Sequence, residues 1–453
     1  MALAARRAGE AMAFARAAEL ALAAVRLLPV DDLAGRRALR VDAATALLHA
    51  GAHADAAACF LAAAEGAPQV QALRLRQRAA EALLDCGAVE RGRALLQEVL
   101  RALGHPLPRG PLLRAVRVAR QALLLRRRGF EFTPRAEAEL PEATVLWIDT
   151  LRAARLAVVN VDPITARMYQ LEHLYQCLEV GEPGRVVQAV AGHAAYLAHT
   201  GAKTGLAAAR LLDQARAIAE RHGLANSRYL ALCAGAVAFS RGAWATALAE
   251  LDRAQPPMAS ELVQGGVRGS GAALLSGMCG LWSLSCSFLL GDLAGLASRR
   301  ERYLQIVRAA GDRASEARVS VGMQVGATLA ADLPERAAEE LAAALQCWPR
   351  GGCVVERGHA FLAARAIDMY VGDGAHAWAR HCDAWPAYVG SYLYQGQYGR
   401  VLGEFWRGAA ALLAAREAGG TAGQRLRATA EAAAGCIHRE RALSAAKYSL
   451  GRI

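Results

Sequence analysis

Residues 104–135 contain the strongest local charge imbalance in this sequence: many arginines and a single acid, Glu131. Arg114, Arg117 and Arg120 recur every three residues, a spacing that places them along one side of a helix. Apolar residues occupy another side: Leu112, Leu113, Val116, Ala119 and Leu123. The residues predicted to contact a partner are Arg114, Arg117, Arg120, Arg126, Arg127 and Arg128.

A basic amphipathic helix of this kind binds anionic lipid, nucleic acid or an acidic protein face. The alternative interpretation is an arginine-rich solvent face on a connecting helix. We expect a positive stripe that contacts an acidic surface on a partner protein. Nucleic acid is the third choice, because no helix-turn-helix pattern accompanies the arginines.

Aromatic side chains gather between residues 378 and 398. Such residues often anchor a partner in a groove, but they are equally typical of packing inside a helical repeat. The sequence leaves both interpretations open. The set comprises Trp378, Trp385, Tyr388, Tyr392, Tyr394 and Tyr398, of which the first four are the candidate binding residues.

Catalytic motifs are missing from the sequence. It contains no GxxxxGK[ST] phosphate loop, no HRD or DFG kinase motif, no HExxH and no GxSxG. His376, His381 and Cys382 lie close together, but without the spacing and the fourth ligand of a metal site. The glycines at 265, 266, 269 and 271 lack the lysine that would hold phosphate, so we interpret them as a loop. We therefore expect no enzyme activity, no cofactor and no metal.

The elements that must position these residues are helices. The chain has 453 residues, of which 55% are hydrophobic and only 6% aromatic, with abundant alanine and 14 prolines. Alanine is the best helix former and lets helices pack closely. The composition predicts an all-α fold. The net charge of +12 and the pI of about 9.5 permit acidic partners without requiring them.

A helical hairpin is encoded between residues 45 and 68. Counting from Gly51, Ala56 lies at +5, Phe60 at +9, Ala63 at +12 and Pro68 at +17. Small residues permit the close approach of two antiparallel helices, and a large residue one turn away fills the groove. This is the spacing of a tetratricopeptide-type repeat, whose period is about 34 residues. We predict a TPR-like α-solenoid of antiparallel helix pairs.

The same phasing recurs along the chain. Gly87 follows Gly51 by 36 residues, and further turns are predicted at Gly242, Asp332 and Gly372. An apolar helix is predicted over residues 8–28, with too few residues before it for a full first helix, and the last helix runs to the C-terminus without a polar cap. Both ends resemble cuts through a longer protein. We expect three parts: TPR-like repeats over 1–104, a basic linker helix over 105–141, and a second repeat block over 142–453.

Location is indicated by two features. Residues 269–291 carry no charge and are long enough to span a bilayer, but frequent glycine and serine favour a buried helix inside the array over a membrane span. The ten cysteines have irregular spacing without a CxxC pair, which is typical of thiols in a reducing cytosol. We expect a cytoplasmic protein for which a membrane is not a partner.

The ordered segments resemble a known family. They comprise FARAAELALAAV (14–25), the hairpin at 45–68, residues 78–110, LLLRRRGFEF (123–132), residues 147–166 and LEVGEPGRVVQA (178–189). Together they resemble the C-terminal tetratricopeptide region of large bacterial signalling proteins of the myxobacterial type. Those proteins also carry a serine/threonine protein kinase domain and a central AAA-type ATPase domain. Their catalytic residues have no counterpart in these 453 residues.

The function that follows is a non-catalytic interaction module that binds a protein or peptide in its groove. The resemblance implies the tail of a serine/threonine kinase–ATPase polypeptide, with the kinase and ATPase domains as further partners. One alternative is a kinase-family member that itself acts in phosphorylation signalling. A second is a nucleic-acid-binding regulator that uses the basic helix.

Overall fold

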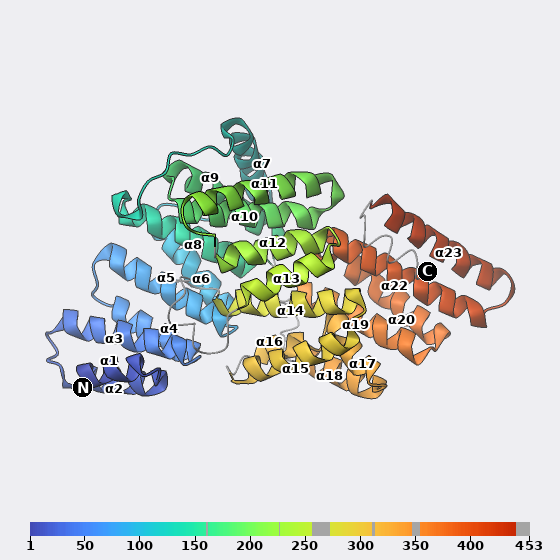
Figure 1. The fold of residues 1–453 in the computed structure, drawn as a ribbon, viewed down its shortest axis with the longest axis horizontal. Helices are drawn as coiled ribbons and strands as arrows, with labels where there is room; N and C mark the ends of the chain where they lie inside the picture. Colours follow the sequence, from blue (N-terminus) through green and yellow to red (C-terminus); the bar gives the residue numbers. More distant parts are fainter. Residues whose placement is uncertain (160–161, 226, 256–271, 310–312, 347–353, 441–453) are drawn as a thin grey trace. The chain divides into compact units, whose positions relative to one another are not determined.

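The computed structural model describes residues 1–159, 162–225, 227–255, 272–309, 313–346 and 354–440. Within these residues the chain forms helices, turns and loops, and no strand occurs. The chain divides into two compact units, Met1–Glu182 with Pro256–Leu275, and Pro183–Gln255 with Ser276–Ile453. Each is built from consecutive antiparallel helix pairs of tetratricopeptide type (Figure 1). The predicted all-α fold class is confirmed.

The first unit begins with three helix pairs and continues with an edge helix and one further pair. Its helices are α1 (Ala2–Glu10), α2 (Phe14–Leu27), α3 (Leu33–His49), α4 (His53–Ala64), α5 (Gln69–Asp85), α6 (Val89–Ala102), α7 (Pro111–Arg128), the short 3-10 helix η1 (Glu137–Glu139), α8 (Glu142–Val158) and α9 (Pro163–Val180).

The second unit repeats the scheme. Its helices are α10 (Pro183–Thr200), α11 (Ala202–Arg221), α12 (Arg228–Ser240), α13 (Trp244–Ala254), α14 (Ala272–Leu290, of which residues from Ser276 belong here), α15 (Leu293–Ala309), α16 (Arg313–Arg318), η2 (Gly322–Val325), α17 (Gly326–Ala330), α18 (Pro334–Gln346), α19 (Val354–Val371), α20 (Gly374–Val389), α21 (Tyr392–Gln395), α22 (Gln397–Glu417) and α23 (Gly420–Arg439).

The predicted hairpin forms as α3 and α4. Gly51 connects them with a φ of 77°, a left-handed conformation that glycine adopts without steric cost. Ala56, Phe60 and Ala63 are at most 1% exposed and lie in one core with residues of α5. Small residues at the crossing and one large residue beside them thus pack as their spacing predicts.

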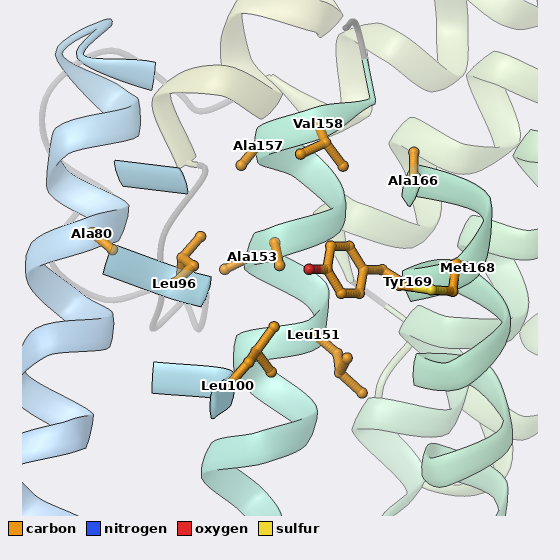
Figure 2. Packing of buried hydrophobic residues seen from close by; sticks show 11 residues of the cluster. Ala80, Leu96, Leu100, Leu151, Ala153, Ala157, Val158, Ala166, Met168 and Tyr169 are labelled. Atoms are coloured by element: carbon orange, nitrogen blue, oxygen red, sulfur yellow. The ribbon is translucent and has the colours of Figure 1, made fainter. Parts of the chain in front are cut away.

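A second core joins the early repeats to the pair α8–α9. Leu96 and Leu100 of α6 pack against Leu151 of α8, and Tyr169 of α9 lies on the other side of α8 (Figure 2). All four side chains are buried. This core fixes α9, the helix against which the basic helix α7 packs.

The start of the chain differs from the sequence prediction. A single helix over residues 8–28 is wrong, because α1 ends at Glu10 and α2 begins at Phe14. Met12 has a φ of 58° in the turn between them. The break lets the two helices fold back on each other as a pair. Ala11 and Ala13, which flank Met12, favour helix, and Gly9 lies inside α1, so neither glycine nor proline marks the turn itself.

The later repeats turn where predicted. Gly242 and Gly372 have φ values of 75° and 83°, and Asp332 adopts the same left-handed conformation at 59°. The uncharged segment forms α14, whose side chains between Cys279 and Leu289 are largely buried. Among the residues that the structure describes, no helix is long and apolar enough to cross a membrane. The glycine group at 265–271 lies outside the described residues.

Candidate partner-binding surfaces

The arginines of α7 divide into two groups, and Arg114 belongs to the inward one. Its Nη1 donates to Asp162 Oδ2 at 2.9 Å and to Thr165 Oγ1 at 3.1 Å. Asp162 also caps α9, since its Oδ1 accepts the Thr165 backbone N–H at 3.0 Å. Arg114 therefore ties α7 to the N-terminus of α9 through a carboxylate that is already in use as a helix cap.

Arg117 is the second inward arginine. Its Nη2 lies 2.7 Å from Oε1 of Glu172, a residue of α9 that is only 5% exposed. A buried carboxylate is unfavourable without a cationic partner. This ion pair therefore fixes which side of α7 faces α9.

Arg128 is the third inward arginine, and we call the contact of these three arginines with α9 the α7–α9 seam. Its Nε pairs with the carboxylate of Glu179, and its Nη2 donates to the carbonyl oxygen of Leu178 at 2.8 Å. The last carbonyls of a helix have no partner within the helix, and Arg128 supplies one. Gly181, with a φ of 79°, then ends α9.

The remaining arginines point away from α9. Arg120, Arg126 and Arg127 are exposed and have no ion-pair partner among the residues that the structure describes. The six arginines therefore do not all face solvent, because the acids of α9 hold Arg114, Arg117 and Arg128 inward. A role of the exposed three in binding a partner stays a prediction.

The apolar side of α7 also lies outward. Leu112 is 75% exposed, Leu113 and Val116 are each 57% exposed, and Leu123 is 49% exposed. The sequence contained a signal for this arrangement that we did not use. Glu172 and Glu179 lie seven residues apart in the stretch that forms α9, so they share one side of that helix and could have been recognised as partners for the arginines.

Three of the four aromatic candidates, Trp378, Trp385 and Tyr388, are buried or half-buried in the second unit. Tyr388 is 2% exposed, stacks on Phe361 with ring centroids 4.2 Å apart, and donates its hydroxyl to the Gly399 carbonyl at 2.7 Å. Trp385 is half-buried and meets Tyr394 edge to face at 5.7 Å. These contacts favour the interpretation of repeat packing, and we call these residues, with His381 and Trp378, the aromatic cluster.

A glycine makes room for this packing. A Cβ atom on Gly403 of α22 would lie 2.4 Å from Cε1 of Tyr388. Trp378 is half-buried at the edge of the cluster, and its ring is parallel to that of His381 at 5.7 Å. Tyr392 begins the short helix α21, but its side chain lies outside the described residues.

His381 is packed in the way an apolar residue would be. It is 1% exposed, and its ring stacks on Trp385 at 5.0 Å. Neither ring nitrogen has a hydrogen-bond partner among the residues that the structure describes. Burial, with the nearby charges of Arg365 and Arg407, lowers the pKa of His381 to about 4. The imidazole is therefore neutral at ordinary pH.

His376 and Cys382, which lie near His381 in the sequence and for which we expected no metal site, are both exposed. His376 is exposed and its Nδ1 lies 2.8 Å from Asp373 Oδ2, where the aspartate caps α20. Cys382 is exposed, whereas His381 points into the core. Within the described ranges, no group of three or more His, Cys, Asp or Glu side chains is arranged to hold a metal ion.

Sequence reasoning missed an open hollow in the first unit. It lies between α3 and α5, the first helices of two successive pairs, and has a volume of about 360 Å³. Arg37 spans one end, where its Nη1 donates to Gln71 at 3.3 Å and its Nη2 donates to the Gly66 carbonyl at 2.8 Å. The lining residues are Ala34, Arg37, Ala38, Val41, Asp42 and Gln71. The sequence did offer one signal: the lining residues of α3 and Gln71 of α5 are separated by about one repeat length.

Comparisons with known proteins add little to this description. No protein-family model matches the chain, and no curated protein matches its sequence. Among solved structures, the chain is similar to the TPR domain of P58(IPK) at 13% identity, covering 89% of this chain and 99% of that domain, with a TM-score of 0.22. At that TM-score the likeness carries no argument. The assignment to TPR-like helix pairs rests on this chain's own helices, turns and cores.

Proposed function

We propose that the chain is a non-catalytic, cytoplasmic interaction module that binds a protein or peptide partner through the hollow between α3 and α5. The hollow supports the proposal because it combines exposed small residues, such as Ala34 and Ala38, with charged and polar groups from Arg37, Asp42 and Gln71. An extended peptide in such a hollow can pack its side chains on the alanines and pair its polar groups with the walls.

The test uses two exposed alanines. Ala38 lies in the hollow on α3, whereas Ala58 lies on α4, outside the hollow lining. A photo-crosslinking residue in place of Ala38 should capture the partner, and the same residue in place of Ala58 should not. Ala38→Arg should weaken binding by about tenfold or more by filling the hollow, and Ala58→Arg should leave it unchanged. Equal capture from both positions would contradict the proposal.

We further propose that this module is the tail of a serine/threonine kinase–ATPase polypeptide and acts in bacterial signal transduction. The support is the ordered resemblance of residues 14–25, 45–68, 78–110 and 123–132 to the tails of such proteins. Separately expressed kinase and ATPase domains of such a polypeptide are then the first partners to mix with the chain. Sequencing of the neighbouring genomic region would show whether those domains are encoded in frame.

The rival function is that of a phosphorylating enzyme. It requires a nucleotide site, and the sequence provides no phosphate loop or kinase motif. Isothermal titration of the purified chain with Mg-ATP distinguishes the two. We expect no saturable binding, and a measurable dissociation constant would overturn the non-catalytic proposal.

A further inference from the structure

The outward face of α7 is more apolar than that of an ordinary surface helix. An amphipathic helix normally turns its apolar side to the core and its charged side to water. Here three ion pairs and their accompanying hydrogen bonds hold three of the six arginines against α9, beside the buried Leu125. The outward face is left to solvent and consists of Leu112, Leu113, Val116, Ala119 and Leu123.

Exposed cations border this face on both sides. With 3.6 residues per turn, Arg120 and Arg127 lie about two turns apart along one border, and Arg126 lies along the other. Residues 111–128 include no aspartate or glutamate. All three arginines are exposed, and none has an ion-pair partner among the described residues. The face therefore offers an apolar strip within a purely positive rim.

We propose that the outward face of α7 binds the surface of an anionic lipid bilayer, with the helix lying in the interface. Leu112, Val116 and Leu123 would enter the boundary between headgroups and acyl chains. The arginines on both borders would reach lipid phosphates, each strengthening binding about fivefold. The proposal departs from the sequence expectation that a membrane is not a partner, because that expectation did not foresee an outward apolar face.

An acidic protein helix is the competing occupant, and two observations favour the bilayer. First, the strip is aliphatic, and its exposed part lacks the Trp and Tyr anchors that dominate protein interfaces. Second, one helix face offers less than the roughly 800 Å² per partner that a stable protein interface buries. In addition, a bilayer surface carries phosphates in all directions and can reach the arginines on both borders of the strip. A single acidic helix of a protein partner would reach the arginines of one border only.

The experiment is flotation of the full chain with vesicles of phosphatidylcholine alone or of phosphatidylcholine mixed with phosphatidylglycerol. We expect binding to the mixed vesicles only, decreasing as salt rises because exposed charges are screened over about 10 Å at 0.1 M. Equal binding to both vesicle types, or to neither, would overturn the proposal.

Matched variants locate the site. The triple change Arg120→Gln, Arg126→Gln and Arg127→Gln should weaken binding roughly a hundredfold. The control is a second triple variant, in which the exposed Arg416, Arg425 and Arg427 are each replaced by Gln; it should weaken vesicle binding far less.

The apolar strip needs its own pair of variants. Leu112→Gln with Leu123→Gln should abolish binding, and Leu27→Gln with Leu33→Gln, at leucines of comparable exposure, should not. Circular dichroism would confirm that each variant keeps its helices. If the α7 variants leave vesicle binding unchanged, or instead release a protein partner, the face does not serve a bilayer. The hollow between α3 and α5 is untouched by these changes, so the proposed function is tested separately.

Discussion

The α7–α9 seam and the aromatic cluster were both candidate partner surfaces, yet they keep their residues from solvent by different means. In the seam, Arg117 reaches a buried acid of another helix, and its neighbour Arg120 stays in water. In the aromatic cluster, Tyr388 and His381 are buried by stacking on other rings. The arginines of α7 are therefore divided between the inward and the outward side of one helix. Most residues of the aromatic cluster, in contrast, are buried together.

The difference follows from what each residue type needs when buried. An aromatic ring gains free energy from any apolar neighbour, so a group of rings packs together without an exact partner. A guanidinium is stable inside only where a carboxylate meets it. The positions of Asp162, Glu172 and Glu179 thus decide which arginines of α7 are available to a partner.

The largest expected effect is in the aromatic cluster. Tyr388→Ala removes a buried ring stacked on Phe361 and should lower the free energy of unfolding of the second unit by about 4 kcal/mol. Tyr388→Phe keeps the ring and should cost only about 1 kcal/mol for the lost hydrogen bond to Gly399. Urea unfolding followed by circular dichroism measures both. A Tyr388→Ala variant with unchanged stability and reduced partner binding would make Tyr388 a contact residue instead.

The next effect separates the two groups of arginines. Arg117→Glu places a second carboxylate beside buried Glu172 and should lower the free energy of unfolding by about 3 kcal/mol. Arg120→Glu is the control and should change it by less than about 0.5 kcal/mol, because Arg120 is exposed. Hydrogen exchange of residues 163–180 should increase in the first variant only. If both substitutions lowered the free energy of unfolding equally, the structural distinction between inward Arg117 and outward Arg120 would be wrong.

Acid should weaken the second unit through His381. The pKa of His381 is about 4 in the folded protein and near 6.5 when unfolded, so only the unfolded chain takes up the proton between these values. Stability should therefore fall as the pH decreases from about 6.5 to about 4, by about 3 kcal/mol for this residue. His199, whose pKa is also lowered to about 4 by burial, should add to the loss.

Substitution assigns that acid sensitivity. His381→Phe keeps an aromatic ring among Trp385 and Phe361 and should reduce the loss of stability on acidification, with unchanged or higher stability at neutral pH. His376→Phe, at an exposed position, should leave the pH profile as it is. Thermal unfolding at a series of pH values gives the comparison, and identical profiles for both variants would assign the sensitivity elsewhere.

The smallest expected effect concerns the cap of α9. Asp162→Asn keeps a side-chain oxygen for the cap but removes the charge that faces Arg114, and both side chains are partly exposed. It should lower the free energy of unfolding by about 0.5–1 kcal/mol, and less at high salt. A loss that does not depend on salt would mean that the ion pair contributes little and that the cap geometry is disturbed.

Much of the fold could be predicted because its signals are local. Gly51, Gly242 and Gly372 end helices where a left-handed residue is needed. Ala56, Phe60 and Ala63 are buried as their spacing requires. The turn at Met12 was missed because the alanines on both sides of it favour helix and do not mark a helix end. The hollow between α3 and α5 was missed because it depends on two helices one repeat apart.

The sequence by itself determined where the helices and most of their turns lie, since small residues, glycines and a period of 3.6 act within a few residues of one another. Tertiary structure decided which side of α7 faces inward. The acids that pair with Arg114, Arg117 and Arg128 are separated from them by 48, 55 and 51 residues along the chain. Because a buried charge must meet its counter-charge, that choice was made by the position of α9.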